Sequence, residues 1–273
     1  MIPARYFPFP DAQYRLQIGA SPLAPHESIL EPDEHRDHEL ALKRACFAAR
    51  DNYYFLAHPG SEAAQREAAL YLSQGSLDNF RALGDSVQED LLLLDLTQPG
   101  IPLIAGHLCF PNAWSLDDKL GRSFLEIHSP VPHFATTLGP PSEKLLARLK
   151  PHRPVARLNW ALKATAQLDL TLRWSAWEAT QKALVTPTNA GERCYLRIER
   201  QTLSLLPETQ SVLFTLHSYV QPLATFSPEQ LHRIHGVLST CPPAMLDYKG
   251  ISPFLEPVLE WLRQNAARET DPE

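Results

Sequence analysis

Two histidines near the middle of the chain could carry chemistry. His107 interrupts a mostly apolar run over residues 101–111, and His128 lies in the proline-flanked sequence Ile-His-Ser-Pro-Val-Pro over residues 127–132. A neutral imidazole is a good ligand for haem iron when a carbonyl or carboxylate holds its second nitrogen. Either residue also fits a core or hinge position. The residue types alone therefore leave a ligand and a structural interpretation open.

A second candidate is a predicted strand that carries charged side chains. Residues 195–206 and 211–221 flank a Pro-Glu-Thr-Gln turn, which predicts a β-hairpin. Alternation along the first strand places Arg197 and Glu199 on one face and Arg200 on the other. The face that carries Arg197 and Glu199 either meets solvent or lines a polar pocket.

The turn also predicts the register of this hairpin. Antiparallel pairing sets Glu199 opposite Ser218 and Arg200 opposite His217.

These residues need a body to hold them, and the hydrophobic pattern predicts one with mixed helices and strands. Residues 1–36 form an extended arm packed on the body, residues 37–265 form one domain, and residues 266–273 form a polar tail. The predicted helices cover residues 37–50, 62–72, 115–120, 142–149, 228–238 and 253–265. The predicted strands outside the hairpin cover residues 53–57, 91–96, 101–110 and 155–163.

Composition excludes several classes of protein. The chain has 273 residues and 44% hydrophobic content, enough for a large core without staples. Its net charge of -6 gives no basic footprint for nucleic acid or an anionic membrane, and no apolar stretch predicts a membrane helix. The four cysteines form no C-x-x-C pair, so a zinc ribbon or covalently attached haem is not expected. We expect a cytoplasmic protein with reduced thiols.

Several short motifs follow one another along the chain. They are Phe7-Pro8-Phe9-Pro10, Val87-Gln88-Glu89-Asp90, Gly106-His107-Leu108-Cys109-Phe110-Pro111, Ile127-His128-Ser129-Pro130-Val131-Pro132, Arg157-Leu158-Asn159-Trp160, Arg197-Ile198-Glu199-Arg200-Gln201 and Tyr248-Lys249-Gly250. In this order they resemble the alpha subunit of the haem-dependent oxidative N-demethylases, the dimethylamine monooxygenase family.

The resemblance implies a fold and a set of site residues. The fold would be α+β and PAS-like: an antiparallel sheet with helices on one face, an N-terminal arm, C-terminal helices, and haem b between sheet and helices. His128 would be the iron ligand, with His107 as the second candidate. The other expected site residues are Arg157 and Trp160 at the cofactor, and Arg197, Glu199 and Arg200 at the distal, catalytic side. Glu199 would hold a protonated amine.

The resemblance also implies a reaction and partners. The enzyme would be a monooxygenase that demethylates a small secondary amine such as dimethylamine with O2 and releases formaldehyde. Electrons would come from NADPH through a partner flavin/iron–sulfur reductase, because the chain has no nucleotide or ferredoxin-type motif. A tetrahydrofolate-binding subunit would collect formaldehyde. The alternative is a haem PAS-like sensor of a gas or ligand without catalysis.

Overall fold

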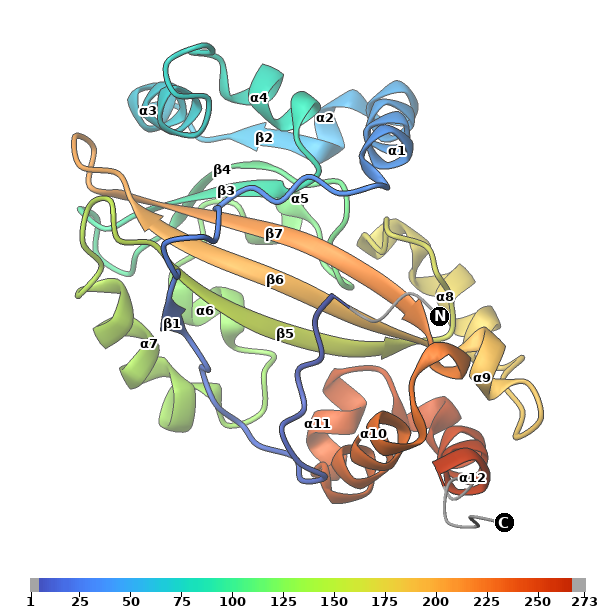
Figure 1. Ribbon diagram of the computed structural model, residues 1–273. Coiled ribbons are helices and arrows are strands. Elements are labelled where there is room, and N and C mark those ends of the chain that lie inside the picture. The colour runs from blue at the N-terminus through green and yellow to red at the C-terminus, as the bar shows by residue number, and fades with distance from the viewer. Residues whose placement is uncertain (1–4, 267–273) are drawn as a thin grey trace.

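The chain folds around a seven-stranded antiparallel sheet with the order β1-β5-β6-β7-β3-β4-β2 (Figure 1). The computed structural model describes residues 5–266, so the predicted tail lies outside it from residue 267 onward. The strands are β1 (Ser21–Pro22), β2 (Phe55–Ala57), β3 (Asp90–Asp95), β4 (Leu103–His107), β5 (Val155–Lys163), β6 (Tyr195–Leu205) and β7 (Ser211–Pro222). The predicted α+β class with an antiparallel sheet is confirmed.

The helices fall before, between and after the strands. They are α1 (Arg36–Ala49), α2 (Asp51–Tyr54), α3 (Glu62–Leu72), α4 (Phe80–Ser86), α5 (Leu116–Lys119), α6 (Phe124–His128), α7 (Gly139–Leu146), α8 (Ser175–Lys182), α9 (Ala190–Arg193), α10 (Pro228–Thr240), α11 (Pro243–Tyr248) and α12 (Leu255–Ala266), with a π-helical turn η1 (Phe134–Leu138) before α7. None of those within residues 5–266 is long and apolar enough to cross a bilayer.

The hairpin of β6 and β7 forms the centre of the sheet, and its predicted register is confirmed. Glu199 lies opposite Ser218, and Arg200 lies opposite His217. On its other side β6 pairs with β5, which places Asn159 opposite Glu199. Since neighbouring residues of a strand point to opposite faces, the charges of β6 divide between two layers of the molecule.

Strand β3 is apolar from Leu91 to Leu94 because helices cover both of its faces. Leu92 and Leu94 belong to the cluster that includes Phe124 of α6 and Leu146 of α7. On the other face, β3 packs with residues of α3 and α4. A strand buried on both sides reads as a continuous hydrophobic run, which is how residues 91–94 read. The helices α3 and α4 thus add a layer opposite α6 and α7.

Two expected details of the middle segment differ in the structure. Ser115 does not cap α5, because its hydroxyl instead bonds the Tyr53 hydroxyl at 2.7 Å and accepts the Leu172 amide at 3.0 Å. The helix expected over residues 142–149 begins earlier, at Gly139, since two prolines occupy its first turn.

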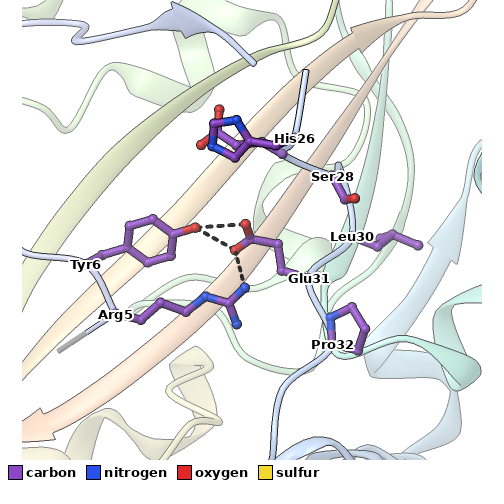
Figure 2. Close-up of a pocket in the computed structure, with 8 residues that line it drawn as sticks. Arg5, Tyr6, His26, Ser28, Leu30, Glu31 and Pro32 are labelled. Atoms are coloured by element: carbon purple, nitrogen blue, oxygen red, sulfur yellow. Dashed lines mark hydrogen bonds and ion pairs between the residues drawn. The ribbon is translucent and has the colours of Figure 1, made fainter. Parts of the chain in front are cut away.

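The N-terminal arm is held on the sheet by a buried carboxylate. Glu31 accepts hydrogen bonds from the Tyr6 hydroxyl at 2.7 and 2.8 Å and from the Tyr219 hydroxyl at 3.1 Å. Figure 2 shows Tyr6 and Arg5 converging on this carboxylate beside a cavity of about 390 Å³. Because Glu31 is already paired here, we interpret this cavity as part of the arm's attachment and not as a ligand site.

Arg200 completes the attachment from the sheet side. It is 2% exposed, and its guanidinium donates to the carbonyls of Ser28 at 2.7 Å and Ile29 at 3.2 Å. Its Nε lies 3.3 Å from Glu31 Oε1. A buried guanidinium with every partner on the arm ties residues 28–31 to β6.

We therefore expect Arg200→Leu to destabilise the fold. The change removes the buried cation beside Glu31 and leaves two carbonyls without their donor, and removing one partner of a buried ion pair costs about 3–5 kcal/mol. Urea unfolding followed by circular dichroism measures the loss. Arg44→Leu, at an exposed position of α1, is the control and should change stability by less than about 0.5 kcal/mol. Equal stability of both variants would contradict the role given to Arg200.

Candidate functional site

A cavity of about 650 Å³, here called the main cavity, lies along β5 near the edge of the sheet. The two-residue β1 pairs only with Val155 and Ala156, so the rest of β5 has no strand on its outer side. Arm residues 7–19 and the helices α6, α7 and α11 close that side instead. Residues from both faces of β5 consequently reach the same cavity.

His128 lines this cavity. It is the last residue of α6, which a capping box between Ser123 and Glu126 begins. Its Nδ1 lies 2.8 Å from the Phe124 carbonyl, so Nδ1 carries the proton and donates it. Its Nε2 has no hydrogen-bond partner within residues 5–266.

The surroundings of His128 keep its imidazole neutral and oriented. Its ring stacks on Phe134 with centroids 4.5 Å apart and planes 11° apart. Burial lowers the pKa of His128 below its usual value, against the raising effect of the Phe124 carbonyl. A neutral imidazole with Nδ1–H held by a carbonyl and Nε2 free is the arrangement that an axial iron ligand requires.

Two of the cavity's basic side chains form no direct ion pair with a described carboxylate, although the Glu199 carboxylate counteracts part of the burial effect that lowers the pKa of each. Arg157 has a buried Nε without a hydrogen-bond partner among the described residues, and Lys249 donates only to the Trp160 carbonyl, at 2.8 Å. Burial lowers the pKa of Lys249 to about 8. The remaining cations of the wall already face carboxylates: Arg15 with Asp11, Lys119 with Asp118 and Lys163 with Glu178. Arg157 and Lys249 are therefore available for an anionic ligand.

Trp160 lies at the same end of the cavity. The Lys249 ammonium sits 4.2 Å from the centre of its ring, and Phe9 of the arm meets the ring edge-on at 5.1 Å. Trp160 thus joins the arm, β5 and the end of α11 into one wall.

Glu199 supplies the buried carboxylate of the cavity. It is 4% exposed, and its Oε2 accepts hydrogen bonds from Asn159 Nδ2 at 3.0 Å and Gln201 Nε2 at 2.9 Å. Its Oε1 has Arg197 Nε at 3.9 Å as its nearest charged partner. One oxygen is fixed by two amides while the other keeps acceptor capacity.

Arg197 lies behind this carboxylate and does not line the main cavity. It is 1% exposed and donates to the Leu168 carbonyl at 3.0 Å, to Ser218 Oγ at 2.9 Å and to the Phe110 carbonyl. These bonds tie β6 to the segments that follow β4 and β5. Among the expected site residues, the structure thus brings together His128, Arg157, Trp160 and Glu199, and places Arg197, Arg200 and His107 outside the lining.

His107 belongs to a separate buried cluster. Asp90, His107 and Cys109 each place one potential ligand atom within 4.8 Å of the others. Asp90 already accepts the amides of Cys109 at 2.8 Å and Phe110 at 2.7 Å, and the buried Lys43 ammonium lies 3.8 Å from its Oδ1. Because Lys43 supplies the positive charge that a buried carboxylate needs, we interpret this cluster as structural.

The side chains of the main cavity suit a haem group. His128 Nε2 could bind the iron, and Arg157 and Lys249 could bind the two propionates. The apolar part of the wall is aliphatic and aromatic, and it includes Leu92, Leu94, Phe124, Phe134, Leu203 and Leu216. A non-covalent macrocycle needs these three features: a ligand, anchors for its carboxylates and an apolar slot.

Three wall residues were not assigned from the sequence. Gln201 could have been, because it lies two residues after Glu199 on the same face of the strand. Asn159 depends on the pairing of β5 with β6, which strand patterns do not reveal. Lys249 stood in a recognised motif, but nothing local shows that its ammonium reaches Trp160.

The position of His107 generates a pH prediction. Burial lowers the pKa of His107 to about 4, against the raising effect of Asp85 bonded at 2.9 Å. The unfolded imidazole, with a pKa of about 6.5, takes up its proton first as pH falls, so this residue makes the fold less stable between pH 6.5 and 4. In urea titrations, the free energy of unfolding of the wild type should fall by up to about 3 kcal/mol relative to that of His107→Gln across this pH window. A constant difference would contradict the burial of a neutral His107.

A comparison with known protein families supports the interpretation of the main cavity as a haem site. Residues 72–259 match the family described as "haem-dependent oxidative N-demethylase, alpha subunit-like". The match covers more than half of the chain and includes β5, β6 and His128. The family's description names haem dependence and an oxidative demethylase subunit, which implies partner subunits. The chain belongs to the haem-dependent oxidative N-demethylase alpha subunit-like family.

Proposed function

We propose that the main cavity binds haem b with His128 as the axial ligand, and that the chain oxidatively demethylates a small secondary amine such as dimethylamine. The observation that carries this proposal is the His128 side chain, which lines the cavity with Nδ1 held by a carbonyl and with Nε2 unpaired among residues 5–266. Arg157 and Lys249 would pair with the propionates. Trp160 would close the end of the cavity beside Lys249.

Glu199 would bind the amine. A small secondary amine is protonated near pH 7, and its N–H can donate to Glu199 Oε1 while Asn159 and Gln201 hold Oε2. Arg197 would act as a positioning residue, because it fixes the strand behind Glu199 without reaching the cavity. Neighbouring apolar residues exclude water and so strengthen the ion pair.

The bound haem would supply oxygen activation, which no side chain provides. The balanced reaction takes a secondary methylamine, O2, two electrons and two protons to the demethylated amine, formaldehyde and water. Electrons would come from NADPH through a flavin/iron–sulfur reductase, and a tetrahydrofolate-binding subunit could take up formaldehyde. A buried carboxylate in the ligand cavity supports the enzyme over a PAS-like gas sensor, because a neutral diatomic ligand needs no counter-charge.

The haem ligand can be tested with two histidine variants. Haem titration of the wild type should give a saturable Soret band. The His128→Ala variant should lose the spectrum of histidine-ligated haem and should bind haem at least about tenfold more weakly. His107→Gln is the matched control, since it removes the other motif histidine, and its haem affinity should equal that of the wild type. The reverse pattern would assign the iron to His107.

The amine site can be tested without a reductase. Dimethylammonium added to the haem-loaded chain should perturb the Soret band, and Glu199→Gln should raise the dissociation constant by about 30-fold or more, because it removes the charge that pairs with the amine. Glu143→Gln, at an exposed position of α7, should leave the dissociation constant unchanged. Equal affinities of Glu199→Gln and wild type would contradict the role of Glu199.

A further inference from the structure

The segment from α7 to the start of β5 carries a basic surface patch. Lys144, Arg148, Lys150 and Arg153 are all exposed, and none forms an ion pair with a described carboxylate. Glu143 is the one acidic residue between residues 139 and 154. Four unpaired cations within ten residues contrast with a chain whose net charge is -6. The net charge of this segment is therefore positive, whereas the net charge of the whole chain is negative.

The patch begins on α7, which forms one wall of the main cavity. The inner side of α7 lines the cavity through Ser142, Leu145 and Leu146, together with Phe134 from the preceding turn. Phe134 in turn stacks on the His128 ring. Lys144 is exposed on α7, and Arg148 is exposed in the turn that follows this helix. Helix α7 lies at the periphery of the molecule, so the solvent and the cavity meet its two sides (Figure 1).

We propose that this patch, defined by Lys144, Arg148, Lys150 and Arg153, is the docking surface for an acidic protein that delivers single electrons to the cavity. The inference rests on the proposed haem-binding function. In the encounter one electron leaves a reduced iron–sulfur or flavin donor and reduces the ferric haem iron to the ferrous state, and no bond forms or breaks. Because α7 and the preceding turn line the cavity, a donor seated there lies on the side of Phe134, which stacks on His128.

An acidic protein fits the patch better than nucleic acid does. The rest of the chain carries net negative charge and would repel a long polyanion such as DNA. A compact acidic protein can contact the basic patch alone. Weak redox encounters bury small interfaces and depend on complementary charge for their association rate. Four cations on one short segment match such an interface in scale.

The test uses haem-loaded full-length chain and an acidic plant-type [2Fe–2S] ferredoxin as the probe. Affinity is measured by biolayer interferometry over a series of salt concentrations, and haem reduction by the reduced ferredoxin is followed by stopped-flow spectroscopy. The test variants are Lys144→Glu/Arg148→Glu and Lys150→Glu/Arg153→Glu. The control is Arg44→Glu/Arg263→Glu, which makes the same change in net charge at exposed positions of α1 and α12.

We expect each test variant to bind ferredoxin about tenfold more weakly at low salt and to lose part of the salt dependence, while the control stays near wild type. Equal weakening by test and control variants would overturn the proposal, as would failure of the wild type to bind ferredoxin. Patch-dependent binding of a 20-base-pair DNA duplex with unchanged ferredoxin affinity would also overturn it. A missing Soret band contradicts the proposed haem function, whereas a normal band with unchanged ferredoxin affinity in the test variants contradicts the docking surface alone.

Discussion

The alternation of side chains along β6 is the constraint on which the rest of the structure depends. A strand at the centre of the sheet carries two arginines and a glutamate, all nearly inaccessible to water. Buried charges are costly unless they are paired and hydrogen-bonded. Arg197 therefore donates to carbonyls of two connecting segments, Glu199 accepts from two side-chain amides, and Arg200 binds the arm. These partners determine which segments pack around β6.

One consequence is the main cavity. Because Arg200 and Glu31 fasten the arm on one side of the sheet, residues 7–19 continue over the open edge of β5 and form part of the cavity wall. The helix that ends at His128 forms another part of this wall. A cavity between an arm and a short helix can place a ligand nitrogen, a carboxylate and two cations around one space, although they come from distant parts of the chain.

Sequence patterns predicted the local parts of this arrangement well. The hairpin register, the limits of β5 and the division of Glu199 and Arg200 between two faces follow from period two and one turn. The resemblance to the family selected His128 and also His107, which the structure places in a separate cluster.

The remaining features depend on contacts between distant segments. No local rule shows that the arm supplies the partners of Arg200 or that Lys249 reaches Trp160. The helix α6 could have been predicted, since Ser123 and Glu126 have the spacing of a capping box. The basic patch that begins on α7 could not be predicted from the net charge of the whole chain, because a sum of charges carries no position.

The most direct test of the central claim is to locate the iron. Crystals of the haem-loaded chain, measured at the iron absorption edge, would give an anomalous difference peak at the metal. We predict one peak in the main cavity within bonding distance of His128 Nε2, with the propionates directed to Arg157 and Lys249. A peak beside His107, or a haem bound outside the cavity, would contradict it.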